Sequence, residues 1–392
     1  MHLYSPKRFI MVLARLSDIK GSHISYFSNL VKVHGGINLA QGIPGFAPPS
    51  GLLKYLSETA SQPVHQYAPG TGNTDLLARL EERYTGLFNP DTSNFFIANG
   101  ATEAISLIYT YLHRKMGGAM RVLTFSPAYE SYIHLPNIFG DTLTTLPQDD
   151  HGKFDIGPFE QVIKDEKIQL VFLCSPGNPR GTVYDQQTLS ALADICARQQ
   201  CYLLIDAVYS DLCFDGARPW YPTHQLSPYV FYVNSFSKLL SVTGWRVGYF
   251  LTHQSHYEAL KRIHDYIGLS SPAPFQAAIA RFLEKKEEVE AYVTEVRLLL
   301  ANNYLSARER LLAEGFVIPE HQGGYFIWAR CPKHIDSGTT LGINLYNKYR
   351  TAIIPGAHFG AEWNQYIRIN IAQPPDVLHQ GVNHIGAAVQ KG

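Results

Sequence analysis

Apolar runs of strand length recur through the first half of the chain, with room for helices between them. Runs at residues 94–98 and 121–125 are expected to form strands, and those at 168–174 and 201–205 are almost entirely apolar. Uninterrupted apolar runs are typical of parallel strands that are buried on both faces. Residues 102–115 carry apolar side chains at helical spacing. The alternation of strand and helix patterns predicts an α/β fold with a mostly parallel sheet.

The second half of the chain has a different pattern. Residues 253–267 and 273–314 are expected to be largely helical, and the second stretch is long enough to bridge two domains. Short strands are expected at 325–329, 352–354 and 366–371, among further helices. This mixture predicts a smaller α+β domain beside the large sheet.

The balance of charges limits the classes of partner. The 392 residues contain 33 Lys and Arg and 33 Asp and Glu, so the formal net charge is zero. Such a chain has no overall field that would attract nucleic acid or an anionic membrane, and we expect neither as a partner. Charged residues make up only 17% of the chain, which leaves apolar surface that a partner subunit could cover.

The five cysteines show neither metal-ligand spacing nor a disulfide framework, so no metal site is predicted and a reducing compartment is expected. Cys174, Cys201 and Cys213 lie in apolar surroundings and are expected to be small buried residues. The apolar stretch at residues 9–13 is too short for a signal peptide or a membrane span. A cytoplasmic protein is therefore expected.

The segment 235–249 places Lys238 among small hydroxyl residues, with Arg246 in a glycine-flanked apolar run after it. A lysine in an enclosed site can lose its proton and form a Schiff base with a carbonyl group. An arginine can bind two oxygens of a phosphate at once. A lysine for an aldehyde and an arginine for a phosphate together suggest pyridoxal 5′-phosphate (PLP). Taken alone, Lys238 could be a loop lysine and Arg246 an edge-strand residue.

Residues at the ends of the predicted strands supply other groups that this cofactor needs. Gly100, Ala101 and Thr102 open a helix directly after a strand, where free backbone N–H groups can bind a phosphate. Asp206 follows a buried strand, where a carboxylate is costly without a cationic partner such as a protonated pyridine nitrogen. Tyr129 stands where its ring could stack on a flat cofactor. A turn glycine and a capping aspartate are the ordinary alternatives.

Taken together, these segments resemble the class I and II aminotransferases, which are PLP enzymes of fold type I, and the resemblance covers about residues 35–375. It implies that Lys238 forms the Schiff base with the cofactor and then moves the proton as general acid and base. The residues implied to bind the cofactor are Gly100, Ala101, Thr102, Tyr129, Asn178, Asp206, Tyr209, Ser235, Ser237, Lys238, Arg246 and Tyr67.

Individual roles follow from the same resemblance. Asn178 and Tyr209 would hydrogen-bond the phenolic oxygen of the cofactor. Arg368 would clamp the α-carboxylate of the substrate with its planar fork, and strand alternation places it on the same face as Asn370. The residues implied to bind the substrate are Gly42, Ile43, Asn178 and Arg368.

Three further positions complete the expected site. Tyr67 is implied to reach the cofactor phosphate of a neighbouring chain, so a homodimer is expected. Tyr132 is expected to pack in the core rather than to serve the cofactor. His358 could line the mouth of the site.

The implied architecture has a large doubly wound domain of residues 50–290. A small discontinuous α+β domain would contain residues 1–49 and 291–392. The implied reaction moves an amino group from an L-amino acid to a 2-oxo acid by a ping-pong mechanism. A C–S β-lyase that cleaves cysteine conjugates or cystathionine uses the same lysine and stays open. A non-catalytic regulator is disfavoured, because no basic recognition helix precedes residue 37.

The amino donor is predicted from a missing cation. Aspartate-specific members of the family add a second cation for the distal carboxylate, in some from the segment before the long helix. Residues 268–280 contain no Lys or Arg. Because an enclosed carboxylate without a cation is costly, we expect a neutral donor such as methionine, glutamine or an aromatic amino acid. Residues 38–49 most resemble the kynurenine, methionine and glutamine aminotransferase branch.

Overall fold

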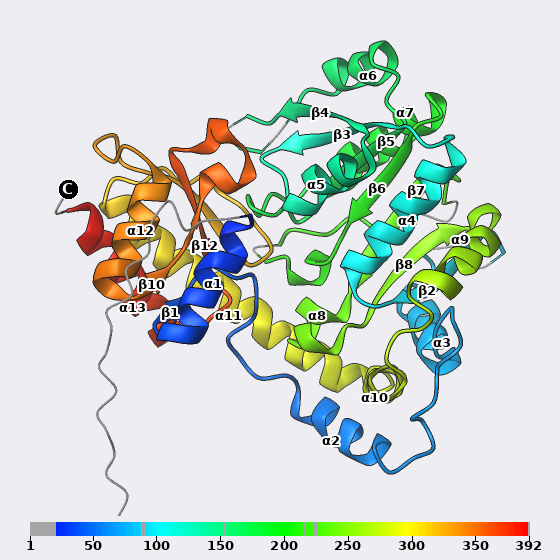
Figure 1. Cartoon of the computed structure of the whole chain (residues 1–392). Helices are drawn as coiled ribbons and strands as arrows, with labels where there is room; N and C mark the ends of the chain where they lie inside the picture. Colours follow the sequence, from blue (N-terminus) through cyan, green and yellow to red (C-terminus); the bar gives the residue numbers. More distant parts are fainter. Residues whose placement is uncertain are drawn as a thin grey trace, which may run out of the picture.

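The computed structural model describes residues 21–390 except 88, 90, 150, 153, 215 and 223–225. Within them, seven strands form the central sheet in the order β2-β8-β7-β6-β5-β3-β4 (Figure 1). β8 runs antiparallel to its neighbours β2 and β7, and the other neighbouring pairs are parallel. The bounds are β2 (Ser93–Ala98), β3 (Arg121–Ser126), β4 (Thr142–Pro147), β5 (Leu170–Cys174), β6 (Tyr202–Asp206), β7 (Val230–Ser235) and β8 (Gly248–His253).

Helices cover both faces of this sheet. The core of one face includes residues of α4 (Ala101–Lys115), α5 (Glu130–Phe139) and α9 (Gln254–Ile267). The core of the other includes residues of α2 (Ser50–Thr59), α3 (Thr74–Arg83), α6 (Ile156–Asp165), α7 (Gln186–Arg198), α8 (Phe236–Leu239) and α10 (Ala273–Leu283). The sequence of β5 is apolar throughout because both of its faces are buried. Leu170 and Phe172 pack in the first core, whereas Val171 and Leu173 pack in the second.

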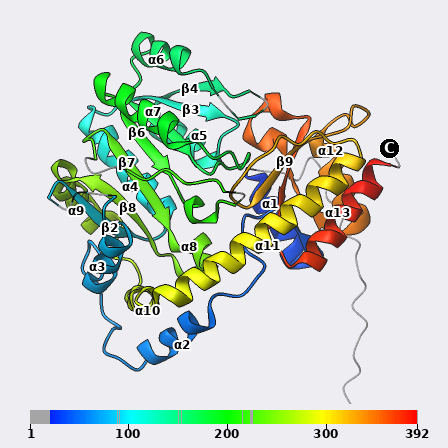
Figure 2. The ribbon, with the colours of Figure 1, turned by 180° about the vertical axis from the view of Figure 1, so that it is seen from behind.

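A long helix, α11 (Lys286–Ala313), extends from α10 to two smaller sheets (Figure 2). One sheet has the order β11-β12-β9, and the other pairs β1 with β10. The bounds are β1 (Ile37–Asn38), β9 (Phe326–Arg330), β10 (Thr351–Ala352), β11 (Ile354–Pro355) and β12 (Tyr366–Asn370). The helices around them are α1 (His23–His34), α12 (Gly338–Tyr349) and α13 (Pro375–Val389).

The predicted fold class is confirmed, because the central sheet is mostly parallel and helices cover both of its faces. The helical stretch expected at 273–314 is divided, since α10 ends at Leu283 and α11 begins at Lys286. The predicted domain boundary at residue 290 falls inside α11 and stays a prediction. No helix of the described ranges is both long and apolar enough to cross a membrane.

The topology gathers polar residues at one edge of the large sheet. β3, β5 and β6 are parallel, so the loops that follow Ser126, Cys174 and Asp206 leave from the same edge. Ligands bind at this carboxyl edge in open α/β sheets. β12 approaches from the smaller sheet and carries Arg368, while the pairing of β1 with β10 anchors the start of the loop 39–49 beside it.

Candidate active site

A cavity of about 250 Å³ opens at this carboxyl edge. It collects every residue of the predicted site except Gly100, Tyr67 and His358. The predicted residues that line it are Gly42, Ile43, Ala101, Thr102, Tyr129, Asn178, Asp206, Tyr209, Ser235, Ser237, Lys238, Arg246 and Arg368. Residues from both ends of the chain thus meet residues of the central sheet in one place.

Lys238 lies on the short helix α8, directly after β7. Its Nζ donates to the carbonyl oxygen of Gly42, and its own carbonyl accepts a hydrogen bond of 2.8 Å from the hydroxyl of Tyr325. Burial and the positive charges of Arg368 and Arg246 lower the pKa of Lys238 to about 8. The amine therefore loses its proton much closer to neutral pH than an exposed lysine does.

Asp206 ends β6 and is only 4% exposed. Its carboxylate accepts a hydrogen bond of 2.5 Å from Tyr132 Oη and one of 3.2 Å from the backbone N–H of Val208. It forms no salt bridge with any residue that the structure describes. Burial raises the pKa of Asp206, and the nearby charge of Lys238 lowers it only in part. A carboxylate held in this way is suited to a cationic group from a ligand.

The opposite side of the cavity is built from the first turn of α4. Gly100 caps this helix at φ 81°, and a Cβ there would lie 2.3 Å from Nη2 of Arg246. The guanidinium of Arg246 donates to the carbonyls of Thr243 and Asn99 at 2.9 and 3.0 Å. Ala101 and Thr102 add backbone N–H groups of the helix N-terminus. Together these groups form a site for an anion.

Arg368, on β12, is the third cation of the cavity wall and is only 1% exposed. Its Nη1 donates to Oδ1 of Asn178 at 2.9 Å, and its Nη2 donates to the carbonyl of Ala40 at 2.6 Å. Its Nε is buried without a hydrogen-bond partner, and the guanidinium carbon lies 4.1 Å from the ring centre of Phe326. Burial lowers the pKa of Arg368 to about 10. A buried cation with neutral contacts is suited to an anionic ligand.

The comparison with known families agrees with this geometry. A family model described as "Aminotransferase class I and II" matches residues 34–385. The chain belongs to the class I and II aminotransferases. It is therefore a PLP-dependent enzyme that transfers amino groups.

Three similar proteins show the range of this aminotransferase's relatives. Escherichia coli methionine aminotransferase is 31% identical over 282 residues, covering 70% of this chain and 72% of that enzyme. An aspartate aminotransferase of Pyrococcus horikoshii is 24% identical, covering 98% of each chain. The solved structure of N-succinyldiaminopimelate aminotransferase from Mycobacterium tuberculosis has a TM-score of 0.86 and 25% identity, covering 96% of this chain and 100% of that chain.

The cavity of the aminotransferase fits PLP. The buried carboxylate of Asp206, without a contacting cation, suits the protonated pyridine nitrogen of the cofactor. The helix start at Gly100 and the guanidinium of Arg246 suit its phosphate. Lys238 lines the same cavity, and its lowered pKa suits attack on an aldehyde.

Several neighbours hold the predicted groups in place. Asn370 donates to the carbonyls of Gln41 and Ile43, each at 2.7 Å, and so fixes the loop around Gly42. A Cβ at Gly42 would lie 2.7 Å from Phe326, so this turn requires glycine. Ser235 Oγ donates to the carbonyl of Val247 at 3.1 Å and accepts a hydrogen bond of 3.1 Å from the backbone N–H of Ser237. These two bonds hold the start of α8.

The expectation that Tyr132 only packs is incomplete. Its ring does stack on Phe172 in the core, at 5.0 Å between ring centres, but its hydroxyl donates to Asp206. Tyr132 follows Tyr129 by three residues and lies on the first turn of α5. Helical spacing could therefore have suggested that both rings reach the same site.

Other residues of the cavity wall were not recognised from the sequence. Glu130 and Ile24 line the cavity, and so does Cys174, which was expected to be simply buried. His358 is not part of the wall, but its Nε2 lies 3.2 Å from Oε2 of Glu130. Tyr67 lies away from the cavity of its own chain and is 81% exposed.

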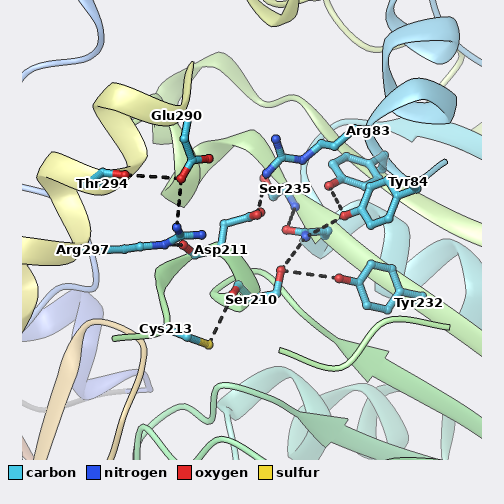
Figure 3. A network of polar contacts seen from close by, with 12 residues as sticks. Arg83, Tyr84, Ser210, Asp211, Cys213, Tyr232, Ser235, Glu290, Thr294 and Arg297 are labelled. Carbon is cyan, nitrogen blue, oxygen red and sulfur yellow. Dashed lines mark hydrogen bonds and ion pairs between the residues drawn. The ribbon is translucent and has the colours of Figure 1, made fainter. Parts of the chain in front are cut away.

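A polar network holds the segment that follows Asp206 in the chain (Figure 3). Arg83 from α3 forms a 2.5 Å ion pair with Asp211, which follows the Asp206 loop in the short helix η2 (Ser210–Leu212). Arg297 from α11 donates to the carbonyl of Asp211 at 2.7 Å. Asn234 on β7 donates to the hydroxyl of Ser210 at 3.0 Å. The loop that carries Asp206 and Tyr209 is thus tied to α3, α11 and β7.

Proposed function

We propose that this aminotransferase takes the amino group of a neutral L-amino acid, such as methionine, glutamine or an aromatic amino acid. A 2-oxo acid then receives the amino group in the second half of a ping-pong cycle. The observation that carries this proposal is the charge of the cavity wall. Its Lys and Arg residues among those described are Lys238, Arg246 and Arg368. Each has a role in binding the cofactor or the α-carboxylate, and none is left for a second carboxylate.

Lys238 is proposed as the lysine that binds PLP covalently. When bound, the cofactor stabilises negative charge that develops on the substrate α-carbon. Once the substrate amine has displaced it, the free Nζ of Lys238 would take the proton from the α-carbon and deliver it to the cofactor carbon, acting as general base and then as general acid. Its pKa of about 8 suits both directions of transfer near neutral pH.

The other residues orient the reactants. We propose that Asp206 keeps the pyridine nitrogen protonated, because an ionised carboxylate in a buried site stabilises a cation beside it. Arg246 and the N–H groups at Gly100, Ala101 and Thr102 would bind the phosphate, with Ser235 and Ser237 close by. Tyr129 would stack on the ring, and Asn178 and Tyr209 would bind its phenolic oxygen.

Substrate binding would use the second arginine. Arg368 offers its guanidinium to the α-carboxylate while Asn178 and Ala40 hold it in place. Gly42 and Ile43 border the same space. The unpartnered Nε of Arg368 supports this assignment, because a buried donor without an acceptor is costly in the free protein.

A homodimer is proposed as the active unit. Tyr67 is 81% exposed, and Tyr266 and Leu269, in the segment that Gly70 approaches, are 92% and 45% exposed. These residues present apolar surface to a partner. Tyr67 would reach the cofactor phosphate of the neighbouring chain. A mixture of Tyr67→Phe and Lys238→Ala chains should recover activity through hybrid sites. A fully active monomer in sedimentation would contradict the proposal.

The donor class is tested with one shared 2-oxo acid. The ratio kcat/KM is measured for methionine, phenylalanine, glutamine and aspartate. We expect each neutral donor to exceed aspartate by at least about tenfold, or ~1.4 kcal/mol of transition-state stabilisation. Aspartate as the best donor would show that a cation reaches the substrate from elsewhere. Release of pyruvate from cysteine conjugates without a 2-oxo acid would instead indicate a C–S lyase.

A further inference from the structure

One charged side chain of the cavity wall has no role in the proposed chemistry. Five charged residues line the cavity among those described, namely Glu130, Asp206, Lys238, Arg246 and Arg368. Asp206, Lys238 and Arg246 are proposed to serve the cofactor, and Arg368 to serve the α-carboxylate. Glu130 remains, together with the apolar Ile24, Ile43 and Phe326. The part of the substrate that is not bound by the other groups is its side chain, so Glu130 is the charge that this side chain meets.

Glu130 is held by contacts from two other segments of the chain. It is the first residue of α5, directly after Tyr129, and 23% of its side chain is exposed. Its Oε2 lies 3.2 Å from Nε2 of His358, and it hydrogen-bonds Ser22, the N-cap of α1. The ring of His23 stacks on His358 at 5.5 Å. The carboxylate thus has a fixed position at the cavity wall.

The surroundings keep this carboxylate ionised. The contact with His358 lowers the pKa of Glu130, and burial offsets this only in part. The N-terminus of α5 favours a negative charge in its first turn. Glu130 is also close enough to Arg368 to favour the charged form of that arginine. A negative charge therefore stands near the proposed anchor for the α-carboxylate, on the wall of the same cavity.

We propose that Glu130 determines the specificity for the amino donor: it repels a side chain that ends in a carboxylate and accepts one that ends in a hydrogen-bond donor, such as the amide of glutamine. This inference rests on the proposed function. It adds the residue that selects the amino donor and the side-chain group that this residue favours. Two like charges in a partly enclosed site repel each other, whereas an amide N–H hydrogen-bonds a carboxylate. His358 acts as a positioning residue, because it touches Glu130 and not the cavity.

The test uses two unreactive ligands that differ only at one end. Glutaramate carries one carboxylate and one amide, and glutarate carries two carboxylates. Their dissociation constants for the PLP-loaded enzyme are measured by calorimetry, which requires no turnover. The wild-type enzyme should bind glutaramate at least about tenfold more tightly than glutarate.

The matched variants are Glu130→Gln and Glu362→Gln. Glu130→Gln removes the charge with almost no change in shape, and it should reduce the preference for glutaramate to within about threefold. Glu362 accepts a hydrogen bond from Ser126 at 2.6 Å near the same segment but does not line the cavity. Glu362→Gln should keep the wild-type preference. Retention of PLP absorbance shows that each variant is folded.

The outcomes separate this inference from the proposed function. A wild-type enzyme that binds both ligands equally, or a preference unchanged in Glu130→Gln, overturns the inference even if neutral donors are the better substrates. A preference that depends on Glu130 supports it even if no neutral amino acid is turned over. The ratio of kcat/KM for glutamine to that for glutamate should fall in parallel in Glu130→Gln, and damage that is merely structural would lower both values together.

Discussion

Two buried aspartates, five residues apart in the chain, have opposite surroundings. Asp211 is 6% exposed and its carboxylate is paired with Arg83 at 2.5 Å. Asp206 is 4% exposed, but its carboxylate contacts a tyrosine hydroxyl and a backbone N–H rather than a cation. A buried charge that is paired within the chain serves the fold, whereas one left without a cation is available to a ligand. The difference supports the proposal that Asp206 serves the cofactor and that Asp211 serves the fold.

The largest effect on activity is expected from Asp206→Asn. The substitution keeps the shape of the side chain but removes the negative charge proposed to keep the pyridine nitrogen protonated. We expect kcat to fall by at least about a thousandfold, or ~4 kcal/mol. In the cofactor-free protein the same change should leave Tm unchanged or raise it, because a buried unpaired charge is lost. Single-turnover kinetics and thermal unfolding measure the two effects, and a large fall in Tm would contradict this assignment.

Asp211→Asn should instead lower the stability of the protein more than its activity. It leaves the guanidinium of Arg83 without its carboxylate, although Arg83 keeps some contact with water. In the wild-type protein, the carboxylate of Asp211 raises the pKa of Arg83 and so favours the charged guanidinium. We expect the free energy of unfolding to fall by about 2 kcal/mol in denaturant titrations, with a much smaller effect on kcat. Unchanged stability would show that this pair is dispensable.

Tyr132→Phe tests the hydrogen bond that the sequence analysis did not anticipate. The ring still packs on Phe172, so the fold should persist. Without the hydroxyl, Asp206 loses one of its two hydrogen bonds, and kcat should fall about tenfold, or ~1.4 kcal/mol. Wild-type kcat in this variant would mean that the hydroxyl contributes only to packing.

The smallest expected effect is a shift in a pH profile. The neutral amine of Lys238 is the form that captures PLP, so the capture rate of the cofactor-free enzyme should rise with pH and level off above about 8. Asp206 raises the pKa of Lys238, while burial and two arginines lower it more strongly. The midpoint should therefore move to lower pH in Asp206→Asn and stay in place in Asp211→Asn. Stopped-flow absorbance at a series of pH values measures it.

Much of the site could be predicted because its parts are local in sequence. Asp206 directly follows an apolar strand, and Lys238 lies in a short hydroxyl-rich segment with Arg246 after it. Such signals need only a few neighbouring residues. The same applies to β5 and β6, whose apolar runs reflect burial on both faces.

The parts that were not predicted depend on contacts between distant segments. Helical spacing after Tyr129 could have placed Tyr132 near the site, but no local pattern indicates that its hydroxyl bonds Asp206 or that Glu130 meets His358. β4 was not recognised because it forms the edge of the sheet and is half exposed, without the continuous apolar run of a central strand. The antiparallel direction of β8 likewise follows from tertiary pairing.

We propose above that this cavity binds PLP on Lys238, with Asp206 as the partner of its ring. Reduction of the PLP-loaded enzyme with borohydride, followed by peptide mapping, tests this directly, because reduction fixes the cofactor to the lysine that carries it. We expect a pyridoxyl group on Lys238 and none after Lys238→Ala. A label on another lysine, or no label on an enzyme that transfers amino groups, would contradict it.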